Sequence, residues 1–234
     1  MKASELVSRL RAMGDPEIAA HSQRFFKTGA GEYGEGDRFL GIRVPQLRET
    51  VKQYPDVALT EVLKLLRSPL HEVRLFALLH LVQQFERGDE PTREAIYRHY
   101  LDHTRYINSW DLVDSSAPKI VGAYLQNRSH SVLSRLVGSD SLWERRIAIM
   151  ACFHFIRRND FTDTLKLCQR VIDDQHDLIH KASGWMLREI GNRDGATARR
   201  FLKRHYRNMP RTMLRYAIEK YPPEERQRYL ESRI

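Results

Sequence analysis

Cysteine is scarce in this sequence. Cys152 and Cys168 are the only two among 234 residues, and both fall within apolar helical patterns. Two cysteines make neither a disulfide framework nor a four-ligand zinc site. Both thiols are therefore expected to pack in the core as small apolar groups.

Long apolar runs are also missing. No stretch of about 18 consecutive apolar residues occurs, which excludes a membrane-spanning helix. The first residues, Met1–Leu6, lack the apolar segment of a secretory signal peptide. With 41% hydrophobic and 29% charged residues, the chain is expected to have a packed core and a cytoplasmic location.

Acidic residues are outnumbered by basic ones. The sequence has 39 Lys and Arg against 30 Asp and Glu, which gives a net charge of +9. An excess of this size attracts polyanions such as nucleic acids. Much of it is carried by Arg, whose planar guanidinium suits phosphate. A basic surface that is merely solvated is the alternative.

Alternating, strand-like patterns are absent beyond a few residues, whereas helical periodicity runs through nearly the whole chain. The expected fold class is therefore all-α. From residue 60 on, longer and shorter helices alternate, and the longer ones recur every 33 to 40 residues. Helices are expected at residues 3–13, 16–27, 45–54, 60–67, 70–87, 91–102, 109–126, 130–137, 142–157, 161–173, 177–191, 195–206, 211–220 and 223–232.

This period is typical of stacked helix pairs of the HEAT or armadillo type. We expect one domain over residues 1–234, with an irregular helical cap at 1–57 and stacked pairs at 58–234. One helix of each pair would line the concave, basic surface of a right-handed solenoid. The Gly-rich stretch 29–37 is expected to be a flexible loop, because it lacks the Gly-Lys-Ser/Thr of a phosphate-binding loop.

Four stretches of the chain can be aligned in one register. Their third positions are Arg74, Asp114, Arg146 and Lys181, which are 40, 32 and 35 residues apart. If these stretches are repeated helices, one carboxylate lies in a row of cations. The register therefore predicts a basic groove that contains a single acid. The aligned stretches are 72–77, 112–117, 144–149 and 179–184.

Trp110 and Asp114 are four residues apart, so a helix places them on one face and one turn apart. Taken singly, Trp110 would be a core residue and Asp114 a surface acid or a structural ion-pair partner. The register favours a functional pair, because it puts Asp114 where the equivalent positions hold cations.

A second helical stripe contains Lys181, Trp185 and Arg188. A Trp between two cations is a poor core element, since buried charges need partners. It suits a nucleic-acid contact, in which the cations meet phosphates and the indole meets a base or sugar. Trp143 and Arg146 form a similar pair, although Trp143 can equally be a core residue.

His176 and His180 have helical spacing for a metal. The second position of the zinc-protease motif needs Glu, and no third ligand is evident nearby. The two histidines are therefore interpreted as residues at a helix start. We expect no metal and no cofactor.

Four segments resemble the signature segments of the AlkD-type DNA alkylation repair glycosylases. The resemblance extends over nearly the whole chain, and the paired Trp-Asp and Trp-Arg segments are its most specific part. The segments are Phe39–Pro45, Asn108–Asp114, Trp143–Ala148 and Lys181–Glu189.

The resemblance implies hydrolysis of the N-glycosidic bond of N3- or N7-alkylated purines in duplex DNA. Asp114 would be the catalytic carboxylate, and Trp110 and Trp185 would contact the deoxyribose of the lesion. Arg146 and Arg188 would lie near the DNA backbone. Most glycosylases flip the damaged base out of the duplex into a pocket. The resemblance implies an exception, in which the base stays stacked.

Three further cations are candidate DNA contacts: Lys181 from its stripe, Arg43 from the matching N-terminal segment, and Arg74 from the register. Alkylated duplex DNA is the expected partner, and the protein is expected to act as a monomer. Two other functions stay open. One is a non-catalytic binder of damaged or branched DNA, and the other is a protein-interaction solenoid that binds an acidic peptide on its concave face.

Overall fold

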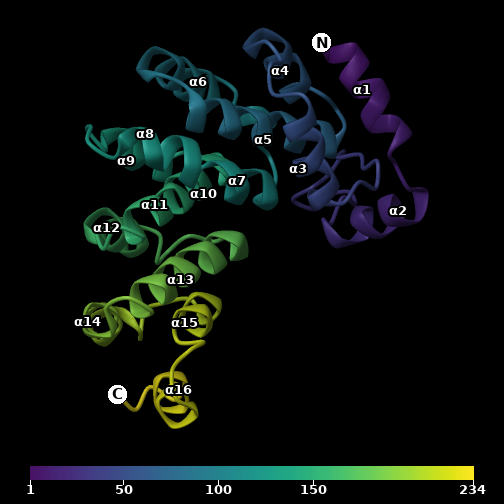
Figure 1. Ribbon diagram of the computed structural model, residues 1–234. Coiled ribbons are helices and arrows are strands. Elements are labelled where there is room, and N and C mark those ends of the chain that lie inside the picture. Colours follow the sequence, from purple (N-terminus) through teal and green to yellow (C-terminus); the bar gives the residue numbers. More distant parts are fainter. The chain divides into compact units, whose positions relative to one another are not determined.

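The computed structural model describes residues 1–234, and every regular element in it is helical (Figure 1). The one extended pairing is an isolated bridge between Arg38 and Leu70. The all-α prediction is confirmed. No helix is both long enough and apolar enough to cross a bilayer. The chain divides into two compact units, Met1–Ser116 and Ala117–Ile234, and the expectation of one domain with a cap at 1–57 stays a prediction.

The first unit is built around one long, buried helix, α5. Helices α3, α4, α6 and α7 pack against it. The helices of this unit are α1 (Ala3–Ala12), α2 (Pro16–Phe25), α3 (Val44–Gln53), α4 (Leu59–Leu66), α5 (His71–Arg87), α6 (Glu90–Asp102), the 3₁₀ turn η1 (Thr104–Tyr106) and α7 (Trp110–Ser116).

Helix α5 is buried from His71 to Val82. A helix covered on nearly all sides has to be apolar around most of its circumference. Its first turn is an exception, because His71, Glu72 and Arg74 are all buried there. Buried charged groups need partners inside the protein. Those partners come from the connection between α2 and α3 and from α7.

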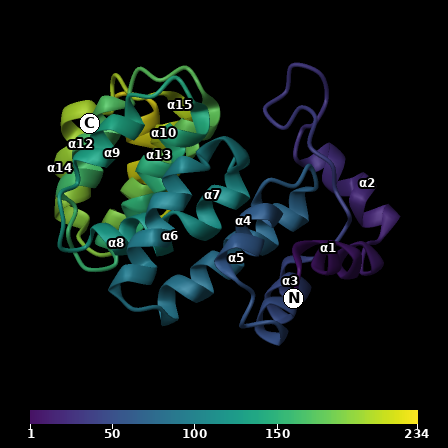
Figure 2. The same ribbon diagram turned by 90° about the horizontal axis from the view of Figure 1, so that it is seen from above.

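The connection between α2 and α3 begins as a loop (Figure 2). It ends as a segment, Leu40–Ile42, whose backbone amides donate to the carboxylate of Glu72, and we call this the pinned segment. Gly41 lies in the pinned part with φ of +83°, and a Cβ there would be 2.0 Å from the carbonyl oxygen of Asp15. Gly36 has a similar φ of +80°, but nothing lies within 4 Å of its Cβ position. Only glycine fits at Gly41 without a shift of the backbone.

These two glycines make a matched pair for a stability test. Gly36→Ala is expected to cost about 1 kcal/mol, the strain of a left-handed residue. Gly41→Ala is expected to cost clearly more in the free energy of unfolding, since the clash with Asp15 adds to the same strain. Urea unfolding of both variants measures the difference. Equal losses would show that the contact with Asp15 is easily relieved.

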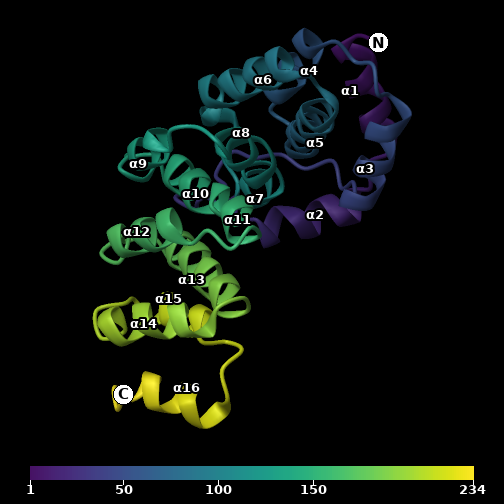
Figure 3. The same cartoon turned by 60° about the vertical axis from the view of Figure 1, so that its left-hand side comes forward.

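The second unit is organised around α13, against which α10, α11, α12, α14 and α15 pack. Figure 3 shows α14 and α15 beside α13. The elements of this unit are the π-helical turn η2 (Pro118–Gly122), α8 (Ala123–Leu125), α9 (Ser131–Val137), α10 (Leu142–Ala151), α11 (Phe153–Ile156), α12 (Thr162–Arg170), α13 (Asp177–Gly191), α14 (Gly195–His205), α15 (Arg211–Ala217) and α16 (Pro223–Leu230).

The helix expected at 109–126 is not continuous. After α7 the chain forms the π turn η2, in which the amide of Gly122 donates to the carbonyl of Ala117 at 3.0 Å. Pro118 has no amide hydrogen and cannot continue an α-helical ladder, which accounts for the change of pitch. A Cβ on Gly122 would lie 2.3 Å from the carbonyl oxygen of Ala151, so glycine allows this turn to pack closely on α10.

Both cysteines of the second unit are buried and free. Burial raises the pKa of the Cys152 thiol to about 12, and it raises the pKa of Cys168 well above its usual value. The thiol of Cys168 donates to the carbonyl of Ser183 on α13 at 3.6 Å. The two residues pack as small apolar groups, as the sequence predicted.

Candidate functional site

Helix α7 has seven residues and carries two of the three predicted catalytic side chains. Trp110 is its first residue and Asp114 follows one turn later. Both side chains are half-buried, whereas Leu112 and Val113 between them are fully buried. The sequence therefore folds α7 with one face in the core and the Trp110–Asp114 face partly accessible, as the spacing of four residues requires.

The indole of Trp110 belongs to an aromatic cluster formed by Phe25, Phe26, Phe39 and Trp110. It stacks on Phe26, with ring centroids 5.2 Å apart and planes 13° apart. Phe25 meets the indole edge-on at 6.0 Å, and Phe26 stacks on Phe39 at 4.9 Å. Phe25 is 57% exposed, so this cluster reaches the surface of the first unit. Stacked and edge-on pairs restrict ring orientation as well as burying area.

A chain of buried ionic groups lies next to the cluster. We call it the relay, and it consists of Arg74, Asp37, His71 and Asp111. His71 is 2% exposed and is bound on both sides, by Asp37 at 2.7 Å from Nδ1 and by Asp111 at 2.8 Å from Nε2. Its ring also stacks on Phe39, with centroids 4.4 Å apart.

Desolvation of the buried imidazole opposes its protonation, but the charges and hydrogen bonds of Asp111 and Asp37 outweigh it and raise the pKa of His71 to about 9. The ring is therefore an imidazolium at neutral pH. Both of its nitrogens donate, one to each carboxylate.

Asp37 is the second buried anion of the relay. Burial would raise its pKa, but the hydrogen bond from His71 and the charge of Arg74 together hold the pKa below its usual value. The guanidinium Nη2 of Arg74 donates to both carboxylate oxygens, at 2.8 and 2.9 Å.

Arg74 was predicted as a DNA contact from its register. The residue is 4% exposed, and Nη1 donates to the carbonyl of Ser68 at 3.1 Å. The structure thus places Arg74 inside the first unit as the partner of Asp37. A cation held in this way has a structural task, and contact with DNA by Arg74 would require it to leave a buried ion pair.

Glu72 pins the segment that precedes α3. Its buried carboxylate accepts hydrogen bonds from the amides of Leu40 at 2.8 Å, Gly41 at 2.7 Å and Ile42 at 3.2 Å. Arg43 follows directly and is exposed. This candidate DNA contact therefore stands on a rigid backbone, with its side chain accessible.

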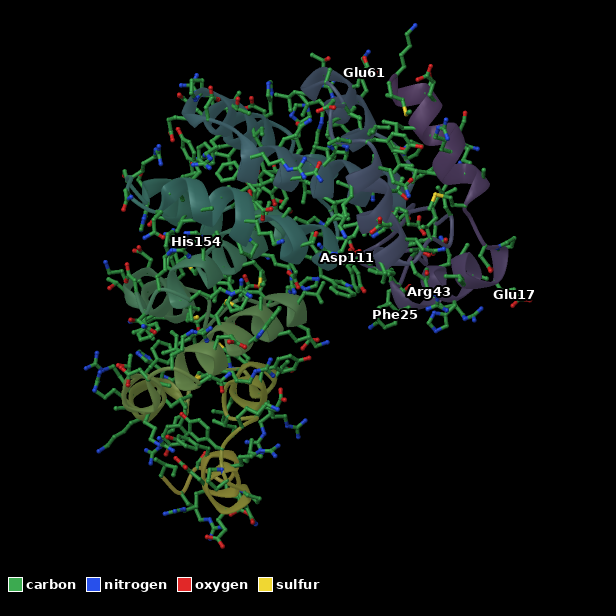
Figure 4. The ribbon with its side chains drawn as sticks, in the orientation of Figure 1. Glu17, Phe25, Arg43, Glu61, Asp111 and His154 are labelled. Atoms are coloured by element: carbon green, nitrogen blue, oxygen red, sulfur yellow. The ribbon has the colours of Figure 1, made fainter.

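A cavity of about 760 Å³ opens between α2 and the pinned segment. Its lining includes Glu17 and Arg43 as well as Asp111 and His71 of the relay. Figure 4 shows Glu17, Arg43 and Asp111 together with the exposed Phe25. The cavity also contains Phe26, so it adjoins the aromatic cluster of Trp110.

In the second unit, α13 carries the predicted stripe of Lys181, Trp185 and Arg188. All three are half-buried. The indole nitrogen of Trp185 donates to Glu189 at 3.2 Å. Lys181 pairs with Asp177 at 2.7 Å, and Arg188 pairs with Glu219.

Arg146 on α10 is nearly as buried as Arg74. It is 5% exposed, and its Nη1 donates to the carbonyl of Leu178 on α13 at 2.6 Å. Two of the three cations that share the register are therefore buried, while Asp114 and Lys181 are half-buried. The DNA-binding roles of these residues stay predictions.

Several residues of this region were missed by the sequence analysis. Asp111 was assigned no role, and Asp37 was assigned to a flexible loop, yet both bind His71. No group of three or more His, Cys, Asp or Glu side chains is arranged to hold a metal ion. His176 caps α13 by accepting from the amide of Leu178 at 3.1 Å, as expected of a residue at a helix start.

Comparison with known proteins adds the family. The profile of the DNA alkylation repair enzyme family matches residues 6–221. A solved structure of a predicted DNA alkylation repair enzyme from Enterococcus faecalis superposes with a TM-score of 0.69 at 16% identity, over 90% of this chain and 98% of that one. At this identity the superposition shows a shared fold. A search of curated proteins returned no match. Because the profile spans nearly all of the sequence, the chain belongs to the DNA alkylation repair enzyme family.

Proposed function

We propose that this protein is a DNA glycosylase that hydrolyses the N-glycosidic bond of cationic N3- or N7-alkylated purines in duplex DNA. The observation that carries the proposal is the placement of Asp114, a half-buried carboxylate one turn from the half-buried indole of Trp110, in a member of this family. The relay and the aromatic cluster hold the start of the same helix.

The substrate explains why one acid suffices. An N3- or N7-alkylated purine already carries a positive charge, so it departs as a neutral base when it takes the electron pair of the glycosidic bond. No general acid is needed. Positive charge then develops on the sugar, and water adds to C1′ with loss of a proton.

Asp114 is suited to that second half of the reaction. A fixed carboxylate stabilises the oxocarbenium-like state and positions the attacking water. Its partial burial strengthens the interaction, because fewer waters screen it. The face of Trp110 adds an attraction for the cationic sugar. For Trp185 a contact with the sugar is proposed from the family resemblance alone.

The cationic side chains that are accessible are proposed to contact the DNA phosphates. Arg43 is exposed on its pinned segment, and Lys181 and Arg188 are half-buried on α13 with acidic neighbours that DNA phosphates could replace. Arg74 and Arg146 are assigned supporting tasks inside their units, because both are almost fully buried. The net charge of +9 favours a polyanionic partner.

A duplex that contains a single 7-methylguanine tests the proposal. We expect time-dependent release of the free base, measured by chromatography, and an abasic strand that stays intact until alkali is added. An unmodified duplex is the control. Release no faster than spontaneous depurination would reject the enzyme, and tight binding without release would favour the non-catalytic binder of damaged DNA.

A further inference from the structure

The relay and the aromatic cluster both contact His71, and both also reach Trp110. His71 binds Asp111 at 2.8 Å, and Asp111 is the chain neighbour of Trp110. The indole of Trp110 stacks on Phe26 at 5.2 Å, and Phe26 contacts the ring of His71 with centroids 5.0 Å apart. Trp110 is thus tied to His71 by two independent paths.

Helix α7 needs such anchoring because it is short. Seven residues make about two turns, which are marginal as an isolated helix. Its last residue, Ser116, is held by the hydroxyl of Tyr100 at 2.9 Å. Its first turn is held by the bond between Asp111 and His71 and by the stacking of Trp110.

His71 is itself fixed in place by more than Asp111. Asp37 binds its other nitrogen at 2.7 Å, and Phe39 covers one face of the ring at 4.4 Å. Asp37 is in turn held by two bonds from Arg74. The imidazole therefore cannot turn or tilt without breaking several contacts.

We propose that His71 is a positioning residue for base release, which acts through Asp111 and Phe26 to fix the indole of Trp110 relative to Asp114. This inference rests on the proposed function, because it is in that reaction that the spacing of indole and carboxylate around the sugar matters. His71 and Asp111 do not act on the substrate themselves in this assignment.

The expected size of the effect follows from the precision that the reaction needs. A displacement of about 1 Å in a group that faces the reacting atoms can cost roughly 100-fold in rate. Loss of the bond between Asp111 and His71 removes the polar anchor of the first turn of α7, so the orientation of the Trp110 indole then depends on its stacking and on the core packing of the helix. The rate should then fall while the cations that bind DNA are untouched.

Asp111→Ala tests the path through the hydrogen bond between His71 and Asp111, and Asp111→Asn is the conservative variant. In Asp111→Ala we expect the single-turnover rate at saturating 7-methylguanine duplex to fall about 10- to 100-fold, with Kd unchanged. Asn keeps an oxygen that can accept from Nε2 of His71, so Asp111→Asn should recover most of the rate. Asp102→Ala, which removes an exposed acid at the end of α6, is the matched control.

Phe26→Leu tests the path through the ring of Phe26, which contacts both His71 and Trp110, and it leaves every hydrogen bond of the relay in place. We expect the rate to fall in this variant too. The double variant should lose less than the product of the two single losses, because both paths act on the same indole. If the effects instead multiply independently, the two paths do not converge on Trp110.

A spectroscopic readout separates positioning from general stability. The chain has three tryptophans, so protein labelled with 5-fluorotryptophan gives three ¹⁹F resonances, which Trp→Phe variants assign. Asp111→Ala should shift or broaden the resonance of Trp110 and leave those of Trp143 and Trp185 unchanged. A Trp110 resonance that does not respond, or three that change together with a loss of thermal stability, would overturn the inference. Absence of base release by the wild-type protein would count against the proposed function instead.

Discussion

Replacing Asp114 by Asn is expected to lower the rate of base release by about 100-fold or more. Asn has nearly the same shape and keeps one oxygen, so the change removes the negative charge with little change in volume. That charge is the group that faces the developing sugar cation in the proposed reaction. Its half-buried position on α7 makes it more effective than a carboxylate in open water. Single-turnover measurements on a 7-methylguanine duplex give the rate directly.

DNA affinity should hold or rise in the same variant, because a carboxylate near a phosphate chain repels it. This combination of a lost rate with retained binding separates catalysis from recognition. Asp102→Asn, an exposed acid of the same unit, should leave both quantities unchanged. Base release at the wild-type rate by Asp114→Asn would remove this carboxylate from the mechanism.

Replacing Arg74 by Met should lower the free energy of unfolding by about 3–5 kcal/mol. Met fills part of the volume of the removed side chain, so the loss is mainly electrostatic. It leaves the buried carboxylate of Asp37 without the two bonds from Nη2, and leaves the carbonyl of Ser68 without its donor. Removal of one partner of a buried ion pair is costly because the other charge stays behind, away from water.

Arg87→Met is the matched control, since Arg87 is an exposed arginine at the other end of α5. It should change stability by no more than about 0.5 kcal/mol. Urea unfolding followed by circular dichroism measures both variants. A loss for Arg74→Met as small as that of the control would mean that water enters and solvates Asp37. Adding Asp37→Asn to Arg74→Met should restore part of the stability, since it removes the stranded charge.

The helices could be predicted because their signals are local. Helix α13 was expected at 177–191 and is observed as Asp177–Gly191, and α5 was expected at 70–87 and is observed as His71–Arg87. Periodicity and end signals lie within each segment, so one sequence is enough to find them. There are two exceptions. One is the break after α7, where Pro118 lacks the amide hydrogen that an α-helix needs. The other is the turn at Cys152, which divides the helix expected at 142–157 into α10 and α11.

The relay could not be predicted because its signals are not local. Asp37 is 34 residues from His71 and 37 from Arg74, and Asp111 is 40 residues beyond His71. No spacing rule joins residues so far apart along the chain. The same limit affected the register. Arg74 and Asp114 both lie in helices, as expected, but the register could not tell which side chains would find a partner in the interior.

The buried thiols of Cys152 and Cys168 have a consequence for a protein that works where electrophiles attack DNA. The sulfur nucleophile is the thiolate, and burial keeps both residues in the thiol form, with the pKa of Cys152 at about 12. Methylating agents therefore meet no ionised cysteine on this chain. In a member of the DNA alkylation repair enzyme family, both cysteines are thus kept from the class of reagent that alkylates DNA.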